Sequence, residues 1–429
     1  MTWNRWYGLK SYVKSALWIV PLIAIALQMV MTRVVHRIGV WLHATTGFLD
    51  LSMAGAQVLL QTIITMTLSF TVFTFGSLLV AIQVASGQYT PRIIATTLLR
   101  DNAIRYTVGL FIFTMLFALK TLNRMDTTVH QFSTWVAALF GLVSLVAFLF
   151  LIDYAARLLR PISLVDRIGR QGIAVLEDVY PYVIKDPHEP TPPHQELNRP
   201  PDRVVNHRGK SAIILAVNLE ALVTAGRTWN GIIEFVPYVG DFVAGGEPLF
   251  RLYGGTSAID EGKLQGAVAF GTERTIEQDA TCAFRVLVDI AIKALSKAIN
   301  DPTTAVVAID QIHRLLRVVG QRHLRVEQMR DGTGQVRVIF RTPNWEDFVH
   351  LAFCEIRHYG AENIQIARRL RAMIENLIKT LSEFHQPALR EQLDLLDRTI
   401  EKIYVIPEDL ALARIADSQG LGGPSSVPF

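Results

Sequence analysis

The chain has 429 residues, of which half are hydrophobic and only 19% are charged, whereas about 25% of the residues in ordinary soluble domains are charged. A formal net charge of +4 argues against the strongly basic surface of nucleic-acid-binding proteins, so we expect no nucleic acid partner. Cys282 and Cys354 lie far apart and in no CxxC or CxxH pattern. We therefore predict no disulfide framework, no zinc site, and no other metal or cofactor.

Apolar segments are concentrated in the N-terminal third of the chain. Four of them are long enough to cross a bilayer and predict transmembrane helices at 15–32, 51–85, 104–122 and 134–154. The first segment follows several basic residues and contains Ala24-Ile25-Ala26, so a cleaved secretory signal is the alternative there. The second has no Asp, Glu, Lys or Arg, and about 30 helical residues extend about 45 Å, beyond the hydrocarbon core of about 30 Å. We expect this helix to tilt, kink or project into water.

Basic residues are distributed unequally between the two sides of these four segments. One side carries ten lysines and arginines and the other carries four. Because the more basic side faces the cytoplasm, both termini are predicted to be cytoplasmic, in a multi-pass protein of the bacterial inner membrane. The ten residues are Arg5, Lys10, Lys14, Arg92, Arg100, Arg105, Arg157, Arg160, Arg167 and Arg170, and the four are Arg33, Arg37, Lys120 and Arg124.

The second predicted span carries a seven-residue repeat of small and polar residues. The repeat consists of Gly55, Thr62, Ser69, Gly76 and Gln83, with Gln57, Gln61 and Thr65 in a neighbouring row. A seven-residue period keeps one stripe against a partner helix, and small residues let membrane helices approach closely. The stripe therefore predicts a helix-packing surface, with the lining of a polar path as the alternative. The absence of ionisable residues argues against a proton relay.

The remaining sequence predicts a water-facing region in several parts. After the transmembrane domain, 1–160, we expect an amphipathic helix on the inner surface (157–182) and a Pro-rich linker, together spanning 161–210. His188, His194 and His207 are irregularly spaced there, which predicts solvent exposure rather than metal binding. An α+β domain is predicted at 211–341, a helical bundle at 342–417 and a disordered tail at 418–429.

Local patterns place the elements of these domains. Strands are predicted at 212–217, 231–236, 250–253 and 335–341, and helices at 219–227, 276–298, 302–319, 344–359, 361–381 and 387–405. Gly and Asp between 240 and 249 predict tight turns between short strands. Asp301 followed by Pro302 predicts the N-cap and first residue of a helix.

Polar side chains are dense between 266 and 316. Asp289 and Lys293 have the spacing of an ion pair on one helix face. The wider group predicts a polar junction between domains or subunits, or alternatively a ligand site, and consists of Arg274, Asp279, Asp289, Lys293, Asn300, Asp301 and Thr303. No nucleophile–base pair is visible among these residues, so we predict no catalytic residue.

Three segments resemble a known family. The sequences GAVAFGTERTIEQD (266–279) and LVDIAIKALSKAINDPTTA (287–305), together with SGQYTPRII (86–94), look like a widespread bacterial family of predicted inner-membrane proteins known only as a domain of unknown function. The likeness covers most of the chain. It implies the membrane and water-facing parts already predicted, and it implies no activity, substrate or site residue.

The predicted fold is a membrane α-helical domain of four transmembrane helices, followed by a soluble α+β domain and a helical C-terminal bundle. The functional hypothesis is a homo-oligomeric channel or permeation protein with the second span at its centre and a cytosolic regulatory domain. The alternatives are a membrane-anchored assembly scaffold, and a ligand sensor or enzyme with a polar pocket around Asn300 and Asp301. The absence of a P-loop, GxSxG, HExxH or GxGxxG motif makes an enzyme the less favoured hypothesis.

Overall fold

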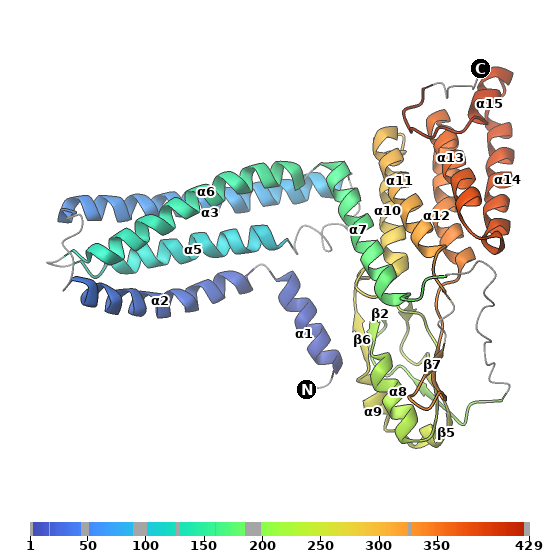
Figure 1. Ribbon diagram of the computed structural model, residues 1–429, viewed down its shortest axis with the longest axis horizontal. Coiled ribbons are helices and arrows are strands. Elements are labelled where there is room, and N and C mark those ends of the chain that lie inside the picture. Colours follow the sequence, from blue (N-terminus) through green and yellow to red (C-terminus); the bar gives the residue numbers. More distant parts are fainter. Residues whose placement is uncertain are drawn as a thin grey trace. The chain divides into compact units, whose positions relative to one another are not determined.

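The computed structural model describes residues 3–16, 18–43, 51–88, 101–125, 129–158, 160–184, 199–324 and 328–423. The chain divides into two compact units, which are described separately (Figure 1). The helical unit consists of 11–87 and 93–163, and the mixed unit consists of 1–10, 88–92 and 164–429. His188 and His194, which were predicted to be solvent-exposed, lie outside the described residues, as do the last six residues of the predicted tail.

Four helices in the described residues are long and apolar enough to cross a membrane. They are α2 (Ile19–His43), α3 (Met53–Gln88), α5 (Asn102–Leu122) and α6 (Gln131–Leu158). Four apolar helices followed by a mixed region and C-terminal helices confirm the predicted fold class. The first span is displaced from its predicted position, because residues 3–15 form a separate helix, α1 (Trp3–Ser15), and Pro21 is tolerated only in the first turn of α2.

Helix α5 lies at the centre of the helical unit. More than half of it is buried (56%), against 22% of each of the other three spans. Phe111 and Phe117 of α5 are fully buried, and Thr114 shares a buried hydrogen bond of 3.0 Å with Ser144 of α6. Helix α3 is therefore peripheral in the single chain, with one face packed and the other uncovered.

Five of the basic residues counted for orientation lie within the four apolar helices. Arg33 and Arg37 are exposed residues within α2. Arg105 is a buried residue of α5, and its guanidinium donates a hydrogen bond of 2.8 Å to the carbonyl of Val13. Lys120 lies in the last turn of α5 and Arg157 in the last turn of α6.

Helix α7 (Pro161–Val179) is amphipathic, and its apolar face packs within the mixed unit. Leu164, Val165, Ile168 and Leu176 are buried. A Cβ added at Gly172 would lie 2.8 Å from the Cβ of Ala283, so α7 closely approaches helix α10 (Ala280–Ala294). The position of α7 at the inner membrane surface stays a prediction.

Two small sheets form the β region of the mixed unit. The larger has the order β1-β5-β3-β8-β7 and the smaller β4-β2-β6. Pairs are antiparallel except for β3 with β8, which are parallel. A shared hydrophobic core includes Phe250, Ile233 and Val338 of the larger sheet and Ile214 and Val268 of the smaller. The strands are β1 (Arg203–Asn206), β2 (Ala212–Val217), β3 (Gly231–Phe235), β4 (Phe242–Val243), β5 (Pro248–Gly254), β6 (Val268–Gly271), β7 (Gln328–Arg330) and β8 (Val336–Phe340).

The end of the predicted linker is ordered structure. Arg203–Asn206 pairs with β5 as strand β1. His207, predicted to be solvent-exposed, is instead buried, with Nε2 2.9 Å from the carbonyl oxygen of Lys210 and its ring against Phe270. The sequence did not predict this strand, because four residues beside several prolines are too few to show a clear alternation of apolar and polar residues.

The tight turns predicted between 240 and 249 are confirmed. Gly240 and Gly246 have φ values of +97° and +91°, which glycine adopts without steric cost. The Asp241 carboxylate accepts a hydrogen bond from the backbone N–H of Tyr238, and the Glu247 carboxylate accepts one from Ala244. These bonds fix the chain between β3 and β5.

The helices of the mixed unit complete the fold. Asp301 caps α11 through the N–H of Thr304, as predicted, whereas α10 is shorter than the predicted 276–298 and begins after its N-cap, Asp279. Asn300 adopts φ +49°, so its left-handed conformation ends the connection between these helices. The bounds are α8 (Leu219–Thr228), α9 (Glu261–Gln265), α10 (Ala280–Ala294), α11 (Pro302–Val319), α12 (Trp345–Gly360), α13 (Ile364–Thr380), α14 (Gln386–Ile403) and α15 (Pro407–Ala413).

The described part of the C-terminal tail is bound rather than disordered. Arg368 of α13 is only 1% exposed, and its guanidinium donates to the carbonyls of Ile415, Gly422 and Gly423. The Asp417 carboxylate accepts hydrogen bonds from the N–H groups of Gly420 and Gly422. Glycine and serine composition predicted disorder for 418–429, but these contacts order residues 418–423.

Candidate functional site

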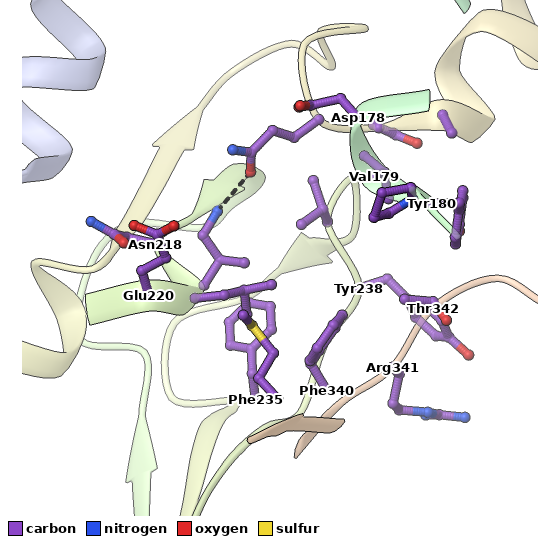
Figure 2. Close-up of a pocket in the computed structure, with 18 of the residues that line it drawn as sticks. Asp178, Val179, Tyr180, Asn218, Glu220, Phe235, Tyr238, Phe340, Arg341 and Thr342 are labelled. Atoms are coloured by element: carbon purple, nitrogen blue, oxygen red, sulfur yellow. Dashed lines mark hydrogen bonds between the residues drawn. The ribbon is translucent and has the colours of Figure 1, made fainter. Parts of the chain in front are cut away.

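The mixed unit contains a pocket of about 740 Å³, within the usual size range of small-molecule sites (Figure 2). It lies beyond the carboxyl ends of the parallel strands β3 and β8, where Phe235 and Phe340 are paired in register. The wall is completed by the first residues of α8 and α10 and by the end of α7.

Aromatic side chains from distant parts of the sequence meet in this pocket. Tyr180 follows α7, Tyr238 lies after β3, and Phe340 ends β8. The Arg341 guanidinium lies 5.0 Å from the centre of the Tyr238 ring, which is a cation–π distance. None of these four residues belongs to a local sequence motif, so sequence analysis did not identify them.

Charged groups of both signs line the pocket. Asp178 and Glu220 are exposed carboxylates, and Arg330 and Arg341 are exposed guanidinium groups. In Figure 2, Asp178 and Glu220 lie on the sides of the pocket away from Arg341. The labelled aromatic residues lie between these carboxylates and Arg341. The two carboxylates are thus separated from Arg341 across one cavity.

Asp279 is the one member of the predicted polar junction that lines the pocket. Its Oδ1 accepts a hydrogen bond of 3.1 Å from the N–H of Cys282 and so caps α10. Among the residues that the structure describes, no group donates to the buried Oδ2. Burial raises the pKa of Asp279 above its ordinary value, although the positive charge of Arg274 opposes the shift. Burial and the charge of Asp279 also raise the pKa of Tyr180.

Most of the other predicted junction residues do not gather around Asp279. Arg274, half-buried ahead of α10, lies near enough for its charge to act on the pKa of Asp279, whereas Lys293, Asn300, Asp301 and Thr303 lie at or beyond the opposite end of this helix. Fifteen helical residues separate the two ends by about 22 Å. The sequence therefore grouped residues that follow one helix but do not converge on a single site.

Asp289 forms an ion pair with Arg285, a partner that the sequence analysis did not predict. Arg285, one turn earlier on α10, donates from Nε to Asp289 Oδ1 at 2.6 Å. The same guanidinium donates from Nη2 to Glu355 Oε2 of α12 at 2.8 Å. This arrangement joins α10 to α12 and is consistent with a packing role.

The predicted stripe of α3 faces away from the rest of the helical unit. Its five members, Gly55, Thr62, Ser69, Gly76 and Gln83, are all exposed. The opposite face, with Leu60, Ile63 and Leu78, is buried. The hydroxyls of Thr62 and Ser69 donate to the carbonyls of Val58 and Thr65, four residues earlier on the same helix.

Comparison with known proteins gives a family but no activity. A family model described as "Predicted membrane protein (DUF2254)" matches residues 14–376. Uncharacterized proteins of Mycobacterium bovis and Mycobacterium tuberculosis are each 24% identical to the chain over 430 residues, covering 95% of this chain and 81% of theirs. No solved structure matches the chain.

Proposed function

The chain belongs to the DUF2254 family of predicted membrane proteins, as its sequence resemblance indicated, and we propose that it is a homo-oligomeric channel or permeation protein assembled through α3. In this proposal the mixed unit regulates the assembly from the cytoplasmic side of a bacterial inner membrane. The supporting observation is the difference between the uncovered faces of α3 and α6.

The uncovered face of α6 suits contact with lipid tails. Between Gln131 and Ile152 its exposed residues are all apolar, and they include Leu139, Leu142, Val146 and Leu149. The uncovered face of α3 also exposes large apolar residues, such as Val72 and Leu79, but it adds polar ones: Gln61, Thr62, Thr65, Ser69 and Gln83. The two helices of the same bundle thus differ in the polar residues that only α3 exposes.

The amide side chains are the strongest reason to place a partner against α3. A hydroxyl that donates to its own helix, as in Thr62 and Ser69, is already satisfied in lipid. The exposed Gln61 amide would be costly against hydrocarbon unless another chain or water hydrogen-bonds to it. A second copy of α3, or a water-filled path between copies, supplies that partner.

The alternative function is a membrane-anchored scaffold that uses the same interface without a path. The back-bonded hydroxyls of Thr62 and Ser69 favour it, because groups satisfied within their own helix need no water. Both functions require the oligomer, and only the channel requires that the uncovered face of α3 reach water.

Gly76→Leu tests the interface. A Cβ at Gly76 meets no atom within 4 Å in the single chain, so the substitution leaves its packing intact. It should nevertheless separate closely packed copies of α3. We expect native mass spectrometry in detergent to show an oligomer for the unmodified protein and for Leu142→Phe, a control on the lipid-type face of α6, and a smaller species for Gly76→Leu. A monomeric unmodified protein would contradict the proposal.

Ser69→Lys distinguishes the channel from the scaffold. A charge at this position of the stripe should alter ion conductance or selectivity in bilayer recordings if the stripe lines the path. Altered currents support the channel. Unchanged currents in an assembly that conducts would assign the stripe to packing alone.

A further inference from the structure

We propose that the pocket of the mixed unit binds a nucleotide, with its base among the aromatic residues, its phosphates at Arg341, and its sugar hydroxyls at Asp178 and Glu220. This inference goes beyond the proposed membrane function and does not depend on it. It rests on the position of the pocket, its size and the order of its polar groups.

The location of the cavity favours a ligand site over a packing defect. Two parallel strands end at the cavity, and the first turns of α8 and α10 reach it. A volume of about 740 Å³ exceeds what a single ion or free amino acid occupies and suits a molecule of several linked groups. The ligand must therefore have more than one chemical part.

The middle of the cavity suits a flat ring. Tyr238 and Phe340 are partly exposed and lie close together in one wall (Figure 2), and Phe235, which is 1% exposed, packs beneath them on the strand next to Phe340. Heterocyclic bases stack on aromatic faces, and this contact tolerates different bases. Arg341 already stacks on Tyr238, so its guanidinium is held at the edge of the aromatic surface.

One end of the cavity suits phosphate. Arg341 keeps its charge at any physiological pH and presents planar donors that match phosphate oxygens. Its side chain is exposed, so a phosphate can reach it without prior rearrangement. Arg330 also lines the cavity, but it pairs with Val336, five residues before Arg341, and its Nη1 donates a hydrogen bond of 2.9 Å to the carbonyl of Gly334 in its own hairpin.

The other end suits hydroxyl groups. Carboxylates near the carboxyl ends of strands accept hydrogen bonds from ribose in nucleotide-binding folds. Asp178 and Glu220 are exposed carboxylates on the sides of the pocket away from Arg341 (Figure 2). A simple anion would gain nothing from them, and a polyamine would be repelled by Arg341. A nucleotide is the ligand class that matches both ends and the aromatic middle.

Binding to the full-length protein in detergent is the test, with ribonucleoside 5′-mono- and triphosphates as probes in isothermal titration calorimetry. Adenosine, pyrophosphate and spermidine are the comparison ligands, because each carries only part of the proposed chemistry or the opposite charge. We expect at least one nucleotide to bind more tightly than all three. Absence of nucleotide binding at millimolar concentration, or tighter binding of spermidine, would overturn the proposal.

Variants locate the binding. Arg341→Ala should weaken nucleotide binding by about tenfold or more, since it removes a charge-assisted contact, and should have little effect on adenosine. Tyr238→Ala should weaken nucleotide and adenosine alike. Arg317→Ala, an exposed arginine of α11 outside the pocket, is the matched control. Equal nucleotide affinity in Arg341→Ala, Tyr238→Ala and the control would place any binding elsewhere and reject this site.

Discussion

The carboxylate of Asp279 occupies the space in which a side chain at Gly240 would stand. A Cβ built on Gly240 would lie 2.2 Å from Asp279 Oδ2, and Gly240 has φ +97°. The turn after β3 and the N-cap of α10 are therefore in direct contact. Glycine is required at this position both by backbone conformation and by the carboxylate that fills the adjacent space.

Gly240→Ala should destabilise the mixed unit more than a matched glycine substitution. Gly246 has a similar φ of +91°, but a Cβ there meets nothing within 4 Å. Gly246→Ala should cost only the backbone strain, about 1–2 kcal/mol, and Gly240→Ala about 1–3 kcal/mol more from overpacking. Thermal and denaturant unfolding of the full protein measure both. Equal losses would show that Asp279 moves away without cost.

Asp279→Asn should increase stability at neutral pH. Burial raises the pKa of Asp279 in the folded protein, so the protonated form is favoured, and stability present at low pH is lost as pH rises through the folded pKa. Asparagine caps a helix about as well as aspartate and carries no charge to bury. The advantage of the variant should therefore disappear toward the ordinary carboxyl pKa of 3.8.

Unfolding midpoints measured across this pH range test the prediction for Asp279. Asp301→Asn makes the same substitution at the N-cap of α11 and serves as the matched control. A pH dependence in Asp279→Asn as steep as that of the unmodified protein would show that another group is responsible.

His385 should give a pH dependence of the opposite sign. Burial lowers its pKa from 6.5 to about 4, so the unfolded chain binds the proton more readily between these values. Stability should then be lost as pH falls from about 6.5 toward 4. His385→Gln should reduce this loss, although it also removes the ring packed against Trp345. The exposed His350→Gln is the comparison variant, and an unchanged acid loss in His385→Gln would count against the prediction.

Elements encoded by neighbouring residues could be predicted from the sequence, whereas the pocket could not. The cap formed by Asp301 and the turns at Gly240 and Gly246 depend on residues a few positions apart. Tyr180, Tyr238 and Arg341 come from segments that meet only through strand pairing and helix packing. No local pattern specifies such convergence, and the same reason explains the missed contact of Arg285 with Glu355.

Burial of polar residues was equally hard to anticipate. Irregular spacing within a Pro-rich stretch predicted exposure for His207, and Gly, Ser and Pro residues predicted disorder for the tail. His207 is nevertheless covered by Phe270, and the tail satisfies the donors of a buried arginine. The small-residue stripe of α3 was visible because its period is local, and the structure adds only that the stripe faces outward.

The proposed orientation can be tested with reporter fusions. If both termini are cytoplasmic, as the distribution of basic residues suggests, reporters joined after Arg100 and Arg170 should give cytoplasmic signals. A reporter after Arg124 should give an external signal. An external signal after Arg170 would reverse the proposed orientation and would place the mixed unit outside the cytoplasm.

Arg368→Ala should release the C-terminal segment. The guanidinium donates to three carbonyls between Ile415 and Gly423 from a position that is 1% exposed. Its removal deletes three hydrogen bonds from a charged donor to the segment, and such bonds contribute about 1.5–3 kcal/mol each. Arg368→Lys should fail to restore the contacts, because an ammonium group lacks the planar array of donors.

Limited proteolysis separates release of this segment from global unfolding. Cleavage within 414–423 should accelerate in Arg368→Ala while the midpoint of global unfolding falls less steeply, because the segment packs at the edge of the bundle. Arg398→Ala is the matched control, since Arg398 forms an exposed ion pair with Asp394 and such pairs contribute about 0–1 kcal/mol. If cleavage is equally slow in both variants, Asp417 and its hydrogen bonds to Gly420 and Gly422 are sufficient to hold the segment.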